Sequence, residues 1–124
     1  MSNFKNTLVL GASDNPNRYS YKAIKMLRAH GHTVIGIGKK KGKVSDVTFN
    51  NLRPHPNTLE IDTITLYLNP KHQALYYDYI LALHPDRIIF NPGAENPELY
   101  RLAKENNIMP IEACTLVLLS TGQY

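Results

Sequence analysis

The regular alternation of short apolar runs with helical segments constrains the fold of this chain more than any other feature. The first run, Thr7-Leu8-Val9-Leu10-Gly11, has the length and composition of a buried strand that stops at a glycine. Apolar side chains then recur at helical spacing over residues 18–30, and Gly31 ends that helix. A second β-branched run, Thr33–Gly38, completes a strand–helix–strand unit whose two strands should pair in parallel.

The same alternation continues to the end of the chain. Asn69-Pro70 and Asn96-Pro97 are both typical helix starts, an N-cap residue followed by proline. Pro110 marks the last strand as an edge strand. The pattern predicts strands at 62–68, 87–90 and 108–111, helices at 70–83, 97–106 and 115–120, and, in the less regular part, a charged loop at 39–43, a short strand near 47–49 and a loop at 54–57.

Strands that alternate with helices predict an α/β fold with one doubly wound, mostly parallel sheet of Rossmann-like type and helices on both faces. The 124 residues show no break in composition, so residues 1–124 are expected to form a single domain. No apolar run is long enough to span a membrane, and the single cysteine, Cys114, fits a reducing compartment. We therefore expect a cytoplasmic protein.

Positive charge gathers in the first third of the chain. The net charge is +4 overall, but residues 1–43 carry nine basic side chains against one acid, Asp14. A segment this basic suggests an anionic partner, either a phosphorylated small molecule, nucleic acid or a membrane surface. Tyrosines do not interleave with the lysines as a single-strand binder requires, so nucleic acid is disfavoured as a partner. No membrane partner is expected, and a phosphorylated small molecule is the favoured ligand.

In an open parallel sheet, ligands bind beyond the carboxyl ends of the strands. The loop after the first strand, from Gly11 to Asn15, leads into a helix N-terminus, where backbone N–H groups and the helix dipole favour a phosphate. Ser13 and Arg18 can add donors there. The loop has one glycine where the dinucleotide fingerprint has three, so a simple turn remains the alternative.

The end of the second strand separates nucleotide ligands from one another. Proteins that bind NAD usually place an acidic residue here, whereas this chain has Gly38-Lys39-Lys40-Lys41. Lysines favour a ribose phosphate, either the 2′-phosphate of NADP or the 3′-phosphate of coenzyme A. A solvated lysine loop without a ligand is the alternative.

Two segments resemble a known family. The loop and helix Gly11-Ala12-Ser13-Asp14-Asn15-Pro16-Asn17-Arg18 and the passage His30-Gly31-His32-Thr33-Val34 are similar to the opening of small bacterial CoA-binding proteins. The fold of that family resembles the nucleotide-binding domain of the succinyl-CoA synthetase α subunit. The resemblance implies a pyrophosphate on Gly11, Ala12, Ser13 and Asn15 with Arg18, the ribose and 3′-phosphate on Gly38, Lys39 and Lys40, the adenine or pantetheine side on Leu68 and Asn69, and the pantetheine exit on Asn91 and Gly93.

The function that follows is a stand-alone binding module for CoA or an acyl-CoA, with no catalytic or metal-ligating group. The alternatives are an NADP-binding reductase, a subunit of an acyl-CoA synthetase-like enzyme, and a basic nucleic-acid-binding protein. Cys114 has two interpretations, a thiol that forms a mixed disulfide with CoA or a small buried hydrophobe. The apolar run 116–119 is a candidate contact between two copies of the chain.

Overall fold

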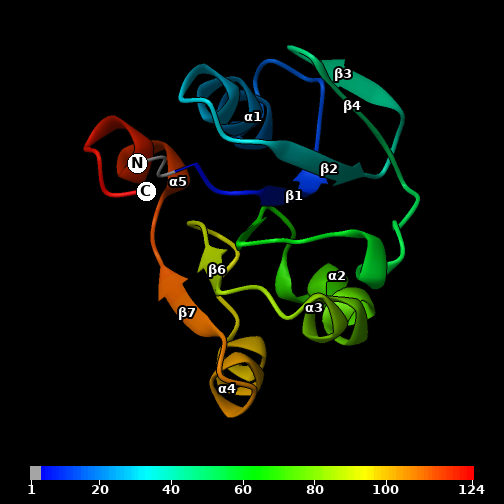
Figure 1. The fold of residues 1–124 in the computed structure, drawn as a ribbon, viewed down its shortest axis with the longest axis vertical. Coiled ribbons are helices and arrows are strands. Elements are labelled where there is room, and N and C mark those ends of the chain that lie inside the picture. The colour runs from blue at the N-terminus through cyan, green and yellow to red at the C-terminus, as the bar shows by residue number, and fades with distance from the viewer. Residues whose placement is uncertain (1–3) are drawn as a thin grey trace.

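A computed structural model describes residues 4–124, and these residues form one sheet of seven strands with helices on both faces (Figure 1). The strand order is β3-β4-β2-β1-β5-β6-β7. The strands are β1 Thr7–Ala12, β2 Val34–Gly38, β3 Gly42–Val44, β4 Val47–Asn50, β5 Thr63–Leu66, β6 Arg87–Phe90 and β7 Met109–Glu112.

All neighbouring strands pair in parallel except β3, which is antiparallel to β4. Without β3, the parallel strands have the order of a doubly wound nucleotide-binding sheet. The chain winds outward from β1 through β2 to β4, then crosses back and winds outward from β5 to β7. The order therefore reverses between β1 and β5, and the predicted α/β doubly wound fold is confirmed.

The helices are divided between the two faces of the sheet (Figure 1). Helices α1 (Tyr19–Ala29) and α5 (Thr115–Ser120) lie on one face, and α2 (Pro70–Gln73), α3 (Tyr77–Leu83) and α4 (Pro97–Glu105) lie on the other. Two 3₁₀ turns, η1 (Pro56–Thr58) and η2 (Ala74–Tyr76), complete the described elements. The two faces have separate apolar cores, because alternate residues of β1 point to opposite sides.

The central strand shows this division clearly. Leu8 and Leu10 pack into the core beneath α3 and α4, whereas Val9 packs into the core beneath α1 and α5. All three side chains are completely buried. A strand buried on both faces is expected to be continuously apolar, which explains why the first run of the sequence is so easily recognised.

Several predicted elements are confirmed and two need correction. Strand β6, helix α5 and the edge position of β7 agree with prediction. The helix expected over 70–83 is instead α2, η2 and α3 in succession, and Leu75, within η2, is 67% exposed. The 3₁₀ turn has three residues per turn, so it shifts the helical phase and turns Leu75 outward.

The charged loop predicted at 39–43 is also shorter than expected. Gly42–Val44 forms strand β3, which pairs with β4 in a hairpin. Its tight connection places Ser45 in the left-handed region with φ of 55°. The loop is therefore anchored at both ends, by β2 before it and β3 after it, and projects between them.

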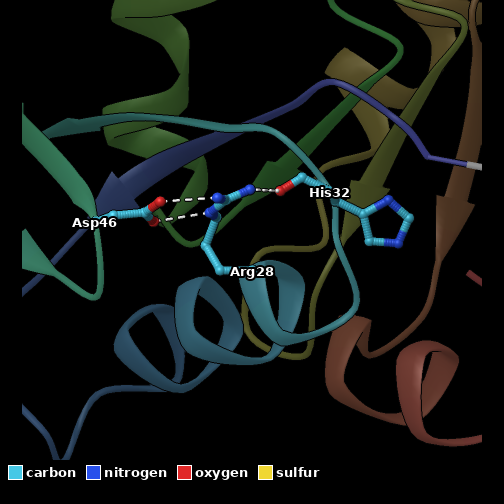
Figure 2. A network of polar contacts seen from close by, with 3 residues as sticks. All are labelled: Arg28, His32 and Asp46. Atoms are coloured by element: carbon cyan, nitrogen blue, oxygen red, sulfur yellow. Dashed lines mark hydrogen bonds and ion pairs between the residues drawn. The ribbon is translucent and has the colours of Figure 1, made fainter.

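Arg28 fastens this hairpin to the body of the domain (Figure 2). Its guanidinium donates from Nε and Nη2 to the two carboxylate oxygens of Asp46 at 2.8 Å each, and from Nη1 to the carbonyl oxygen of His32 at 2.7 Å. Hydrogen bonding to Arg28 lowers the pKa of Asp46 below its ordinary value. One side chain thus connects the end of α1, the start of β2 and the hairpin that holds the basic loop.

Candidate functional site

The carboxyl ends of β1 and β5 meet at the point where the strand order reverses, and Gly11 makes this meeting close. Its φ is +100°, and a Cβ there would lie 3.0 Å from both the carbonyl carbon and the carbonyl oxygen of Tyr67. The Tyr67 N–H donates to the carbonyl oxygen of Leu10 at 2.9 Å. Gly11 therefore allows the β1–α1 loop to lie directly against the backbone that follows β5.

A second close approach joins β1 to β2. Ala12 pairs with Gly38 across the parallel ladder, with a bulge in β1 between Leu10 and Ala12. A Cβ on Gly38 would collide with the carbonyl oxygen of Ala12. The start of the lysine loop is therefore fixed beside the β1–α1 loop, as the sequence pattern required.

The β1–α1 loop is ordered by its own polar side chains. The Asn15 N–H donates to Ser13 Oγ at 3.1 Å, and the Asn17 N–H donates to Asn15 Oδ1 at 3.0 Å. The Arg18 N–H donates to the carbonyl oxygen of Asn15 at 2.9 Å. Asn15 therefore shapes the turn, while the hydroxyl proton of Ser13 remains available to a ligand because its oxygen acts here as an acceptor.

Helix α1 begins in a way that suits an anion. Arg18 occupies the N-cap position without a side-chain capping bond, and no acidic residue lies in the first turn. Lys22, one turn further on, lies 5.3 Å from the ring centroid of Tyr19. The N-terminal end of the helix dipole therefore lies beside basic side chains, and no carboxylate occupies the first turn of the helix.

Lys39 and Lys40 are exposed in the bend that follows β2. They leave the sheet directly after Gly38, which pairs with Ala12. The structure thus brings the two predicted phosphate-binding segments to the same edge of adjacent strands.

Leu68 and Asn69 follow β5 at this edge. The carbonyl oxygen of Leu68 accepts from Gln73 Nε2 at 2.8 Å, and Asn69 caps α2 by accepting from the His72 N–H at 3.0 Å. Asn69 is exposed and Leu68 is half-buried against Gly11. Both predicted residues therefore lie beside the β1–α1 loop. The side-chain oxygen Oδ1 of Asn69 is already engaged in the cap of α2.

The Asn91 side chain is buried beneath the carboxyl ends of the strands and does not face solvent there. The residue is 3% exposed, and Nδ2 donates to Thr65 Oγ1 at 2.7 Å and to the carbonyl oxygen of Leu66 at 2.9 Å. Its Oδ1 accepts from the Thr115 N–H at 2.9 Å. The amide therefore ties together the ends of β5 and β6 and the start of α5, which makes Asn91 a positioning residue in this structure.

Gly93 lies two residues beyond Asn91 in an open turn. Its φ is +91°, and nothing lies within 4 Å of the position that a Cβ would take. Its N–H donates to Glu95 Oε1 at 2.9 Å. The left-handed backbone explains the glycine, and the open space leaves this turn accessible from solvent.

Sequence reasoning missed a second buried amide, Gln73. Its Nε2 also donates to the carbonyl oxygen of Ala94 at 2.8 Å, and its Oε1 accepts from Asn96 Nδ2 at 2.9 Å. Gln73 thereby connects the segments that follow β5 and β6. A glutamine in a helical pattern gives no sign of burial, so no local signal could have identified it.

The structure has one cavity beside the basic loop, along β2 and β4, and another at the amino ends of β1, β5 and β6. The first, which we call the edge cavity, has a volume of about 740 Å³ and is lined by residues that include Ile35, Lys41, Phe49, Asn50 and Arg53. The second, of about 460 Å³, is lined at the amino ends of the strands by residues that include Asn6, Asp62, His84 and Asp86. Because ligands of parallel sheets bind at the carboxyl ends, the edge cavity is the better candidate.

Cys114 is half-buried and lies just before α5. Tyr67 is half-buried, and desolvation by this burial raises its pKa to about 12. Within residues 4–124, no three His, Cys, Asp or Glu side chains gather into a group that could hold a metal ion. Over the same residues, no helix is both long enough and apolar enough to cross a membrane.

The fold is that of a Rossmann-like domain, with a basic loop beside the turn that leads from β1 to α1. The family model described as "CoA binding domain" matches residues 5–120, so the chain belongs to the CoA-binding domain family. Membership supports the binding of CoA in general. No curated protein matches the chain.

Solved structures agree with this assignment. A crystal structure titled as an uncharacterized protein is 49% identical, with a TM-score of 0.93 over 99% of this chain and 100% of that one. A hypothetical protein from Pyrococcus horikoshii OT3 is 20% identical, with a TM-score of 0.85 over 96% of this chain and 84% of that one. A protein from Thermus thermophilus is 19% identical, with a TM-score of 0.79 over 97% and 91% of the two chains. The last two likenesses concern the fold alone.

Proposed function

We propose that this protein is a stand-alone module that binds CoA or an acyl-CoA at the carboxyl edge of its sheet and carries out no chemical step on it. The observation that carries the proposal is the junction of Gly11, Ala12 and Gly38. It holds a helix N-terminus without a side-chain cap and the start of a lysine loop side by side. Membership of the CoA-binding family supports the same ligand.

In this proposal the pyrophosphate binds to the backbone of Gly11–Ser13 and to Arg18 at the start of α1. The helix dipole and the free Ser13 hydroxyl proton stabilise its negative charge. Lys39 and Lys40 bind the 3′-phosphate, and the pantetheine arm runs past Leu68 and Asn69 toward the open turn at Gly93. Asn91 does not contact the ligand in this proposal. It holds the ends of β5 and β6 and the start of α5 in place through its hydrogen bonds to Thr65, Leu66 and Thr115.

A binding role without catalysis is supported by the surroundings of Ser13, whose hydroxyl lies in the loop proposed to bind the pyrophosphate. Its Oγ is hydrogen bonded to the Asn15 N–H. Among the described residues, no histidine or carboxylate is hydrogen bonded to it, so it lacks the base that a nucleophilic serine requires.

The test is calorimetric titration of the protein with CoA, acetyl-CoA and NADP. We expect CoA binding that weakens as salt rises, and a loss of affinity of about tenfold or more in Lys39→Glu with Lys40→Glu. Arg101→Glu with Lys104→Glu is the matched control, because it changes the net charge equally on α4. Equal weakening in both double variants, or no CoA binding by the wild type, would overturn the proposal.

NADP is the second candidate ligand, because a lysine loop after β2 suits a 2′-phosphate as well as a 3′-phosphate. The same titration separates the two. Tighter binding of NADP than of CoA, with the same dependence on Lys39 and Lys40, would favour the reductase alternative.

A further inference from the structure

The edge cavity has a cationic side chain on each of two separate segments. Lys41 belongs to the loop between β2 and β3, and Arg53 belongs to the segment that links β4 to β5. Figure 1 shows this segment running from the β3–β4 hairpin toward α2 and α3. Two basic residues that line one cavity from different segments favour a negatively charged ligand group there.

Arg53 is held in a defined position although it lies at the surface. Its guanidinium carbon lies 3.9 Å from the ring centroid of Tyr76, and Nη1 donates to the carbonyl oxygen of Leu75 at 3.0 Å. The adjoining residue is also fixed, because Tyr79 Oη donates to the carbonyl oxygen of Pro54 at 2.5 Å. Stacking and hydrogen bonding fix the guanidinium plane, so the Arg53 side chain would lose little conformational entropy on binding a ligand.

The charge of Arg53 has no carboxylate partner among residues 4–124. The ion pairs of this part of the chain are Arg28–Asp46 and Arg101–Glu105. The only hydrogen bond of the Arg53 guanidinium to a described residue is the one to Leu75. Most donors of its planar fork therefore remain available, and that fork matches the oxygen atoms of a phosphate.

The rest of the cavity suits the organic part of a ligand. Ile35, Phe49, Leu52 and Pro54 supply apolar surface. Leu52 is 70% exposed, so it has apolar area that a ligand can cover. The edge cavity is open to solvent, so a ligand bound there would keep one side exposed. A simple inorganic anion would leave most of this space and surface unused.

The cavity also adjoins the proposed phosphate turn. A Cβ on Gly42, a residue that lines the cavity, would lie 3.2 Å from the Cβ of Asp14 in the β1–α1 loop. A ligand with its pyrophosphate on that loop can therefore extend its nucleotide end toward Lys41 and Arg53.

We propose that Arg53, together with Lys41, binds the 3′-phosphate of CoA within the edge cavity and makes the protein selective for 3′-phosphorylated ligands. This inference rests on the proposed function, and adds to it a residue outside the lysine loop. Arg53 approaches the phosphate from the β4–β5 segment, and Lys39 and Lys40 surround it from the β2–β3 loop.

The test compares the affinity for CoA with the affinity for 3′-dephospho-CoA in the wild type and in Arg53→Gln. We expect the wild type to prefer CoA, and Arg53→Gln to lose about tenfold in affinity for CoA with little change for dephospho-CoA. Arg101→Gln, with the same change of charge on α4, should keep the wild-type preference. Tyr76→Leu removes the stacking platform and should reduce the preference for CoA in the same direction, to a smaller extent.

Two results would overturn this proposal alone. One is an unchanged preference for CoA in Arg53→Gln. The other is an equal loss of affinity for both ligands, because that would show that Arg53 only supports the β4–β5 segment. A wild-type protein that binds neither ligand would instead overturn the proposed function, and the role of Arg53 with it.

Discussion

Replacing Asn91 by alanine tests whether this residue builds the site or contacts the ligand. The substitution leaves the carbonyl oxygen of Leu66 and the N–H of Thr115 without their partner, in a position that is 3% exposed in the native protein. Thr65 Oγ1 keeps its hydrogen bond to Thr115 Oγ1 at 2.8 Å. Each of the two orphaned groups costs about 1–3 kcal/mol, so the expected destabilisation is roughly 2–6 kcal/mol.

The measurement is thermal or urea unfolding of Asn91→Ala beside the wild type. For a chain of this size the expected loss corresponds to a fall in Tm of about 10–20 °C. Asn17→Ala is the control, because Asn17 is exposed, and its change should stay within about 0.5 kcal/mol. An Asn91→Ala protein that melts like the wild type but no longer binds CoA would refute this reasoning and make Asn91 a ligand contact.

Three further predictions concern the framework around the site. Gly38→Val should lower both stability and CoA affinity, measured by unfolding and calorimetry, because its Cβ would collide with the Ala12 carbonyl oxygen; wild-type values for both would contradict the close approach. Burial holds the pKa of His32 below its ordinary value of 6.5, so the unfolded chain takes up a proton first, and stability should fall as pH decreases below about 6.5. Unfolding at several pH values should show this slope in the wild type and a weaker one in His32→Gln; equal slopes would exclude His32 as the cause. Asp46→Asn should lower Tm less than Asn91→Ala does, because Asp46 is exposed, and a larger loss would mean that the hairpin depends on Arg28 more than its solvent exposure suggests.

The sequence predicts those elements that have clear breaks at both ends. The four residues of β6 and the six of α5 match their predicted bounds, since each is a short apolar run between clear breaks. The break within 70–83 was not predictable from local sequence. It follows Gln73, whose buried side chain donates to backbone carbonyl oxygens beyond two different strands. Strand β3 was missed because Gly42–Val44 is short and becomes a strand only through pairing with β4.

The site residues also fall into those that local sequence predicts and those that depend on distant contacts. Gly11 lies at the end of β1, and Ser13 and Lys39 directly follow β1 and β2, so local sequence and the general rule for parallel sheets were enough to predict the side of the sheet they occupy. Arg53 was not predictable, because its guanidinium stacks on Tyr76, a residue far from it in sequence. Arg53 lies before β5, and Tyr76 lies after it, in η2. Asn91 was placed at the correct strand end, but whether its side chain points outward or inward is decided by Thr65 and Thr115.

The central claim is that CoA binds at the carboxyl edge of the sheet. The most direct measurement is the change of backbone amide chemical shifts when isotope-labelled protein is titrated with CoA. We predict the largest changes at Gly11, Ala12 and Ser13 and in the loop that follows Gly38. Changes concentrated instead at Asn6, Asp62 and His84, around the cavity at the amino ends of the strands, would contradict the account.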